Sequence, residues 1–355
     1  TASSTWRFSY NAINRANNVL SALSVVDDAK KARIEGEAKF IRGALYFELV
    51  RIYGKTWGDG DNAANPGVPL VLKPTRSVQD EDYVARNSVA EVYAQVIKDL
   101  TEAEAALPMT NGNYATKSAA AAMLSRVYLQ QGNYAAARDA ANRVIQSNVY
   151  RLAPTFDQLF YTFIGGGGAI PAEYVFSMTV TTQDGANGLN TYYGVTVGAI
   201  PGTSGRGDFR ILPSHLSLYE EDDDRAAFFI RANNNTYSQK HLDRFGHVPV
   251  VRLAEMYLTR AEANFRLGTA VGATPLADVN AIRQRANLAS LNAVSLTEIL
   301  KERKLELAFE GVQLHDLKRT RSSVRGIAWN SPRLILPIPQ REMDTNKALV
   351  QNEGY

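Results

Sequence analysis

The sequence has no cysteine among its 355 residues. This absence excludes structural disulfides, thiolate metal sites and a cysteine nucleophile, so any chemistry has to come from other side chains. There is also no apolar run near the roughly 20 residues that a membrane-spanning helix needs. The four histidines, at positions 215, 241, 247 and 315, are far apart and lack metal-ligand spacing. We therefore expect a soluble body that holds no metal and no cofactor.

The chain also lacks a strong excess of charge of either sign. It has 39 lysine and arginine residues against 36 aspartate and glutamate residues, which gives a formal net charge of +3. The two signs are interspersed, so no basic stripe matches the phosphate backbone of a nucleic acid. Nucleic acid is therefore not an expected partner.

What the sequence does have is helical periodicity near its beginning. Apolar residues recur at helical spacing over 6–23, and this spacing places Trp6 and Tyr10 in the core and not on a stacking surface. A second, longer helix is predicted from Asp27 to Gly54. We expect the glycine to end that helix in a left-handed conformation.

Helical patterns return at several later points. Ser88 and Glu91 form a capping box at the start of a helix that continues to Pro108. Residues 119–147 follow the tetratricopeptide logic, in which small residues let the second helix of a pair close onto the first. Further helices are predicted over 250–267, 276–286 and 295–310. The predicted helical scaffold thus comprises residues 5–54, 88–148 and 250–320.

The remaining regions lack this periodicity. Residues 55–87 are rich in Gly, Pro, Asn and Asp, which predicts a long loop of the kind that often carries function. Residues 150–248 combine glycine clusters with short apolar runs, which predicts a second loop-rich region with little strand. The segment 321–355 is expected to be extended, with edge structure over 333–341, where prolines alternate with other residues.

Several of these segments resemble the signature stretches of the SusD/RagB family, and they occur in the family's order. The helix over 35–54 and the later Gly-Val-Pro-Leu at 67–70 resemble the early part of the family pattern. Residues 252–263 are similar to its "RxAExxLxxAEA" helix, and residues 276–286 are similar to the "LNxIRxRA" helix that follows.

Two closing motifs carry most of the resemblance. Residues 302–319 resemble "ERxxELxFEGxRxxDLxR", with Gln313 where arginine is usual. Residues 336–355 resemble "LxPIPxxExxxNPxLxQNPGY", with Lys347 and Glu353 in place of prolines. Each motif alone is weak, but their common order is hard to obtain by chance.

The resemblance implies a fold and a function. The fold is all-α, a single SusD-like domain over 1–355 built of tetratricopeptide-like helix pairs (an α/α superhelix), with a loop-rich ligand-binding region and little β-structure. The function is non-enzymatic capture of an extracellular nutrient and its delivery to a SusC-like TonB-dependent outer-membrane transporter. Most members bind an oligosaccharide or polysaccharide, and some, as in the RagB branch, bind peptides. Members are lipoproteins on the extracellular face of the outer membrane, and we expect the lipid anchor to lie outside this chain.

Glycan capture needs flat apolar faces that stack on sugar rings, together with polar groups that fix hydroxyls. Three loop segments offer such combinations: one around Trp57, a second at 192–209 and a third around Trp329. Packing against the body of the protein is about as common for such aromatics as ligand binding. The candidate ligand-binding residues are Trp57, Asp59, Tyr192, Tyr193, Arg206, Asp208 and Trp329.

Other interpretations remain beside this one. A helical glycoside hydrolase would need two carboxylates in a cleft, roughly 5 to 10 Å apart. Arg42, Glu302, Arg303 and Glu310 could suggest such chemistry, but their helical positions favour ion pairs within the scaffold. The acidic run 220–224 lacks the spacing of a calcium loop and is expected to be solvated. A pure protein-protein interaction scaffold is a further alternative, because helix-pair repeats present concave surfaces to peptides.

Overall fold

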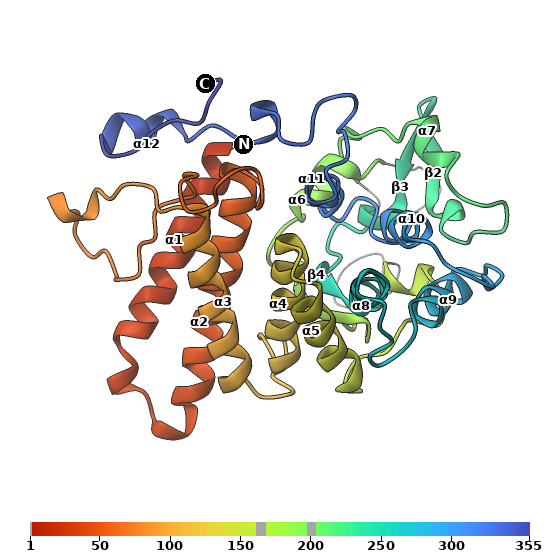
Figure 1. The fold of residues 1–355 in the computed structure, drawn as a ribbon, viewed down its shortest axis with the longest axis horizontal. Coiled ribbons are helices and arrows are strands. Elements are labelled where there is room, and N and C mark those ends of the chain that lie inside the picture. The colour runs from red at the N-terminus through yellow and green to blue at the C-terminus, as the bar shows by residue number, and fades with distance from the viewer. Residues whose placement is uncertain (1, 161–167, 197–203) are drawn as a thin grey trace. The chain divides into compact units, whose positions relative to one another are not determined.

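The computed structural model describes residues 2–160, 168–196 and 204–355. The chain divides into two compact units, Thr1–Asn133 with Leu314–Tyr355 (unit 1) and Tyr134–Gln313 (unit 2). Helices dominate both units and the strands are short, which confirms the predicted all-α class (Figure 1). Among the described residues, no helix is both long enough and apolar enough to cross a bilayer.

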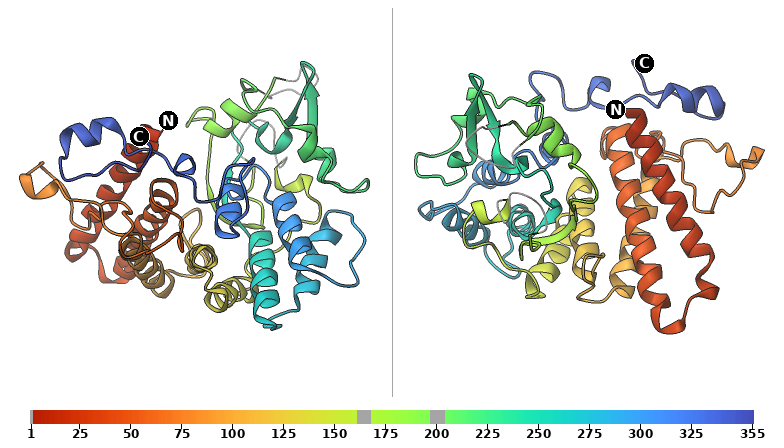
Figure 2. Two further views of the ribbon diagram at one scale, coloured as in Figure 1. Left: turned by 45° about the horizontal axis from the view of Figure 1, so that its top comes forward. Right: turned by 180° about the vertical axis from the view of Figure 1, so that it is seen from behind.

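Four helices form the body of unit 1: α1 (Ala2–Ser21), α2 (Asp28–Tyr53), α3 (Val89–Ala106) and α4 (Lys117–Gln131). Helix α2 packs between α1 and α3, and α3 packs in turn on α4 (Figures 1 and 2). The capping box at Ser88 is confirmed, since its hydroxyl accepts from the Glu91 amide and the Glu91 carboxylate accepts from the Ser88 amide.

The two aromatic residues of α1 take the packing role that their spacing predicts. Trp6 is buried, and its ring centre lies 4.9 Å from that of Tyr10. The Tyr10 hydroxyl donates a hydrogen bond of 2.8 Å to the carbonyl oxygen of Pro69. Tyr10 therefore holds the loop after α2 against the helices, and Trp6 packs behind it on Tyr53 of α2.

The expected left-handed glycine at the end of α2 is wrong. Gly54 has φ −106° and ψ 164°, an extended conformation that any residue can adopt. What excludes a side chain is space, because a Cβ there would lie 2.9 Å from the carbonyl oxygen of Val50. The glycine thus permits a close approach of the chain to its own helix end.

Unit 2 begins with α5 (Tyr134–Gln146), which follows α4 after a tight turn. Gly132 in that turn is left-handed, with φ 70°, as a helix C-cap often requires. Helix α5 packs on α8 (Leu253–Leu267), which also contacts α9 (Pro275–Arg285) and α10 (Leu296–Glu306). The core between these last three helices consists of Ala254, Leu258, Ala261, Val279, Ile282 and Ile299.

The strands in the described residues of unit 2 form two small antiparallel pairs. Strand β1 (Tyr174–Met178) pairs with β4 (Val248–Arg252), and β2 (Phe229–Ala232) pairs with β3 (Asn235–Ser238). The helix predicted from residue 250 therefore begins later, at Leu253, because pairing with β1 keeps the preceding residues extended. The region also contains the short helices α6 (Gly188–Tyr193) and α7 (Pro213–Leu216).

Helix α11 (Gln313–Arg319) lies within the predicted helical scaffold. The segment 321–355 is less extended than we predicted, because it contains a 3-10 turn at Pro332–Leu334 and α12 (Gln340–Thr345), and its residues contain no strand of a sheet. The helix predicted to reach residue 310 ends at Glu306, and Phe309 beyond it has φ 66°. Further 3-10 turns lie at Leu23–Val25, Asp80–Asp82, Asp157–Leu159, Ala226–Phe228 and Gln239–His241.

Candidate functional site

The end of α2 is tied to the C-terminal residues by two long-range side chains. Arg86 donates from Nη2 to the carbonyl oxygens of Tyr53 and Pro66, both at 3.0 Å. Asn352 donates from Nδ2 to the carbonyl oxygen of Tyr53 at 2.8 Å and to that of Leu336 at 2.7 Å. These bonds place the last residues of the chain against the loop that follows α2.

A cavity of about 340 Å³ lies between these segments, and we call it the Trp329 cavity. All of its lining residues belong to unit 1 and come from the loop after α2, from α11, from 329–335 and from 351–353. Its volume is within the range of small-molecule sites in proteins. The polar and aromatic lining residues include Thr56, Asp59, Lys318, Trp329, Asn330 and Asn352.

Two of the predicted site residues meet in this cavity. Asp59 and Trp329 both line it, and the Asn330 amide nitrogen donates a hydrogen bond of 3.2 Å to Asp59 Oδ1. The guanidinium carbon of Arg321 lies 5.4 Å from the centre of the Trp329 ring, which remains partly exposed. A partly exposed indole next to carboxylate and amide groups is the combination that sugar binding requires.

Trp57, the first candidate of the sequence, is placed differently. Its ring centre lies 4.9 Å from that of Tyr93, a buried residue of α3, and Trp57 does not line the cavity. This contact packs the loop that contains Trp57 on helix α3. Its side chain is partly buried and keeps some surface open to solvent.

Lys318 is a lining residue that sequence analysis did not single out. The residue is only 3% exposed, and its ammonium group has a single long hydrogen bond, 3.4 Å, to the carbonyl oxygen of Leu334. Burial, followed by the charge of Arg51, lowers the pKa of Lys318 from its usual 10.5 to about 8, while Asp59 acts in the opposite direction. Few polar partners thus face this group within the protein.

A second group of predicted residues comes together in unit 2, and we call Tyr192, Arg206, Asp208 and Phe209 the Tyr192 patch. Arg206 Nη2 lies 2.8 Å from Asp208 Oδ2, and its guanidinium carbon lies 5.4 Å from the Tyr192 ring centre. Tyr192 is 47% exposed and Phe209 is 48% exposed. The patch therefore presents two open rings beside an ion pair.

Backbone hydrogen bonds hold the patch in place. The amide of Asp208 donates to the carbonyl oxygen of Tyr192, and the amide of Arg206 donates to that of Thr191, both at 2.9 Å. Tyr193 packs on Phe209 of the patch at 4.6 Å and on His241 at 5.1 Å between ring centres. Burial raises the pKa of Tyr193. This tyrosine therefore supports the patch by packing and is less exposed than Tyr192.

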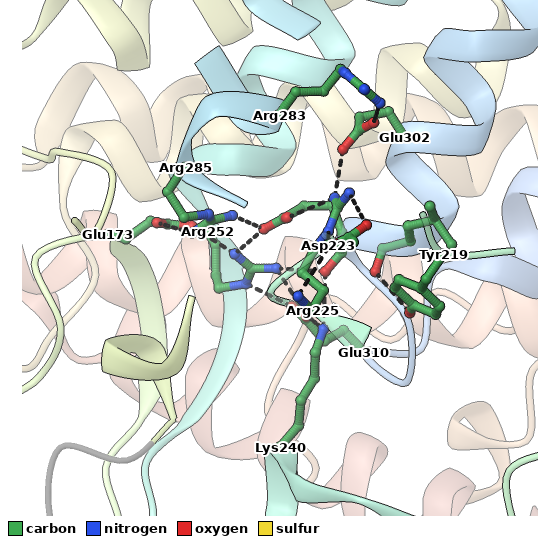
Figure 3. Close-up of polar contacts among 12 residues, drawn as sticks. Glu173, Tyr219, Asp223, Arg225, Lys240, Arg252, Arg283, Arg285, Glu302 and Glu310 are labelled. Carbon is green, nitrogen blue, oxygen red and sulfur yellow. Dashed lines mark hydrogen bonds and ion pairs between the residues drawn. The ribbon is translucent and has the colours of Figure 1, made fainter. Parts of the chain in front are cut away.

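The carboxylates of α10 are occupied by a buried ionic network in unit 2 (Figure 3). Arg225 Nη1 lies 2.5 Å from Glu302 Oε1, and Arg252 Nη1 lies 2.9 Å from Glu306 Oε1. Burial tends to raise the pKa of Glu306, but nearby arginines outweigh this effect and leave it lowered. The ion pairs predicted at Glu302 and Glu310 are confirmed, since Glu310 binds both Arg252 and Lys240.

The ion pairs predicted for the scaffold residues Arg42 and Arg303 are also confirmed. Arg42 binds Asp99 through two hydrogen bonds of 2.8 and 2.7 Å, and Arg303 binds Glu255 at 3.2 Å.

The prediction that the acidic run 220–224 is solvated is wrong in part, because Asp223 is buried and binds Arg225 at 2.8 Å. Within the described ranges, no three acidic or histidine side chains are grouped to hold a metal ion.

Comparison with known proteins decides the family. The SusD family model matches residues 78–331, and a second SusD-like model, described as starch-binding and associating with the outer membrane, matches residues 1–129. The chain belongs to the SusD family.

Several SusD relatives resemble the chain over nearly all of its length. The SusD-like protein P2 of Formosa agariphila is 26% identical over 99% of this chain and 80% of its own. The crystal structure of a SusD superfamily protein from Bacteroides thetaiotaomicron, 26% identical, covers 98% of this chain and 84% of that one with a TM-score of 0.81. A laminarin-binding SusD-like protein, also 26% identical, covers 99% and 86% with a TM-score of 0.80.

Two lining residues of the cavity, Lys318 and Asn352, were not recognised as candidates because they lie in SusD motifs. Lys318 lies in the "DLxR" stretch and Asn352 in the closing motif, and both stretches were interpreted as marks of the fold. A lysine on a helix of mixed charge gives no local sign of burial. Arg86 also links this region, because it binds Val350 and Asn352 at the C-terminal end. Its type and position in a loop give no sign of partners so distant in the sequence.

Proposed function

We propose that this SusD family protein captures a glycan outside the cell, without covalent chemistry, and that the Trp329 cavity is a binding site for it. One observation carries the proposal: Trp329 and Asp59, which are 270 positions apart, line the same cavity of about 340 Å³. The relative that is named for laminarin binding, and the starch-binding description of the matching family model, support a glycan as the ligand.

The cavity chemistry suits a sugar. A partly exposed indole offers an apolar face for the CH groups of a pyranose ring. Asp59 accepts hydrogen bonds from hydroxyls, while the side-chain amide of Asn330 can both donate and accept. Such groups select orientation, and the contact with the ring supplies affinity.

The test is calorimetric titration of the protein against plant, host and microbial oligosaccharides, with a peptide mixture alongside. Trp329→Ala is expected to weaken binding of the glycan by about 30-fold or more, as truncation of a central aromatic contact does. Tyr114→Ala is the matched control, because this tyrosine of unit 1 is 65% exposed and lies outside the cavity. Glycan binding that survives Trp329→Ala unchanged excludes the cavity, and binding of peptides alone excludes the glycan.

The Tyr192 patch is proposed as a second contact surface for the same class of ligand. Its open rings of Tyr192 and Phe209 lie beside the Arg206–Asp208 ion pair, so it offers stacking and hydrogen bonding at once. Tyr192→Ala, introduced into Trp329→Ala, is expected to weaken any glycan binding that the single variant retains. Equal residual binding in the single and double variants would show that the patch makes no separate contact.

Delivery is the second half of the proposed function. We propose that the protein is held by a lipid anchor on the extracellular face of the outer membrane, where it passes the glycan to a SusC-like TonB-dependent transporter. Family membership supports this part, together with the outer-membrane association described for the matching model. Affinity purification of the tagged protein from its native bacterium should recover such a transporter, and protease added to intact cells should digest the protein. Recovery without a transporter, or protection from protease, would contradict it.

A further inference from the structure

A buried cation lines the Trp329 cavity, and we call the part of the lining formed by Lys318 and Thr56 its floor. Lys318 is 3% exposed. Arg51, in the last turn of α2, is 8% exposed and does not line the cavity, but its charge acts together with burial to lower the pKa of Lys318. Like charges in a poorly solvated place repel each other unless an anion lies between them.

The hydrogen-bonding capacity of this floor is largely unused. Three buried side-chain atoms among the described residues have no hydrogen-bond partner, and two of them are Arg51 Nε and Thr56 Oγ1. Thr56 lines the cavity, as does Lys318, whose ammonium carries three donors but makes one bond of 3.4 Å. Buried polar atoms in proteins are normally paired, so this concentration of free donors points to a missing acceptor.

The carboxylates nearby do not satisfy these donors. Glu48 binds the Arg51 guanidinium through Nη2, and Asp59 accepts from Asn330. Glu353 lines the cavity and is exposed, as expected for a solvated charge. The lining thus contains two acidic side chains, Asp59 and Glu353, and two basic ones, Lys55 and Lys318. Of these four, Lys318 is the buried one.

We propose that this floor is an anion-binding subsite and that the captured glycan is acidic, with a carboxylate or sulfate that Lys318 and Thr56 bind while Trp329 stacks on the sugar ring. The proposal rests on the glycan capture proposed above and adds the class of sugar. The anion supplies the acceptors that Thr56 and Lys318 lack, and it offsets the positive charge that Lys318 carries in a buried place.

The first experiment uses matched polysaccharides. Polygalacturonate is titrated beside its methyl-esterified form, and a sulfated galactan beside its desulfated form, so that each pair differs only in the charged group. Binding of one acidic member, weakened about 30-fold or more when its charge is removed, is expected. The pair that responds distinguishes a carboxylate from a sulfate. A neutral glycan that binds as tightly as any acidic one overturns the subsite and leaves the capture function intact.

The second experiment removes the cation. Lys318→Met replaces the ammonium group with an unbranched apolar side chain that is one atom shorter, and it is expected to lower affinity for the acidic glycan to that of its neutral form. Lys117→Met is the control, since Lys117 is an exposed residue of α4 outside the cavity. Affinity unchanged in Lys318→Met overturns the proposal.

A third experiment does not depend on finding the native glycan. Glucuronate, glucose 6-sulfate and glucose are added at equal concentrations, and the rise in melting temperature is compared between the parent and Lys318→Met. The two acidic sugars should stabilise the parent more than glucose does, and this difference should vanish in the variant. If no polysaccharide binds but this difference appears, the glycan-capture proposal fails in its tested form and the anion subsite stands. If the three sugars act alike, the subsite fails.

Discussion

The side-chain amide of Asn352 donates a hydrogen bond of 2.8 Å to the carbonyl oxygen of Tyr53, which lies 299 positions earlier in the chain. The same nitrogen donates to Leu336, and Asn352 Oδ1 accepts from Arg86 at 2.9 Å. Asn352 is 6% exposed, so water does not replace these bonds easily. One amide thus joins the end of α2, the loop before α3 and the C-terminal tail.

Asn352→Ala is expected to lower the free energy of unfolding by about 2–3 kcal/mol, because it removes the buried hydrogen bonds that Asn352 makes with Tyr53, Leu336 and Arg86. Urea unfolding measures the loss, and hydrogen exchange should show faster exchange in residues 349–355. Lys347→Ala, an exposed change in the same tail, should have little effect. Equal stability of the two variants would mean that the tail is held by other contacts.

Asp99→Ala should destabilise the protein by about 3–5 kcal/mol, because it leaves the buried guanidinium of Arg42 without its carboxylate. The control is Asp28→Ala, which breaks an exposed ion pair with Lys31 of the same 2.7 Å length and should cost less than about 1 kcal/mol. Both values come from urea unfolding. Similar losses in the two variants would contradict the difference in burial.

Lys318→Met is expected to be more stable than the parent at pH 7 by about 1–3 kcal/mol, because the variant does not bury an ammonium group. The pKa of Lys318 is about 8 in the folded protein against 10.5 for an unperturbed lysine. Between these values the unfolded parent binds more protons than the folded parent, so its stability rises with pH. The advantage of the variant should therefore shrink from pH 7 to pH 9.5 in urea unfolding. A constant difference would contradict the lowered pKa.

Gly54→Ala is expected to cost about 1–3 kcal/mol, because the new Cβ would lie 2.9 Å from the carbonyl oxygen of Val50 and 3.5 Å from Val89 Cγ2. Gly188→Ala is the matched control, since nothing lies within 4 Å of a Cβ at that position. It should change stability by less than about 0.5 kcal/mol. Thermal unfolding measures the stability of both variants. Equal losses would show that crowding at Val50 does not explain the need for glycine at position 54.

Tyr193→Ala should lower the free energy of unfolding by about 2–4 kcal/mol, because it removes a ring that packs on Phe209 and His241. Its neighbour Tyr192 is half exposed, so Tyr192→Ala should stay within about 0.5 kcal/mol of the parent. Calorimetric melting of the two single variants tests this division of roles. A larger loss of stability in Tyr192→Ala than in Tyr193→Ala would contradict the packing role of Tyr193.

Local signals were enough for most helices of the fold. The capping box at Ser88 and the acidic start at Asp27 lie within a few residues of the helix ends that they determine. Strand β4 shows the limit of such signals, because its residues continue the apolar pattern of α8. Only pairing with β1, more than 70 positions earlier, keeps Val248–Arg252 extended. A non-local partner of this kind leaves no trace in a short window of sequence.

Some residues of the candidate site could be predicted from the sequence, but their common location could not. Asp59 and Trp329 were each recognised by type and loop context, yet no local rule indicates that they share a cavity. Lys318 shows the converse, since its motif identified a helix while its burial depends on the tail that covers it. Whether a long polar side chain is solvated or buried is decided by distant segments.

The order in which the cavity walls are made follows from the division of the chain. Tyr134–Gln313, the whole of unit 2, leaves the ribosome after Asp59 and before Lys318, Trp329 and Asn352. Domains generally fold as units during synthesis, so unit 2 can fold while unit 1 waits for its last helices. The part of the lining that contains Lys318, Trp329 and Asn352 therefore joins Asp59 only after the whole of unit 2 has been synthesised.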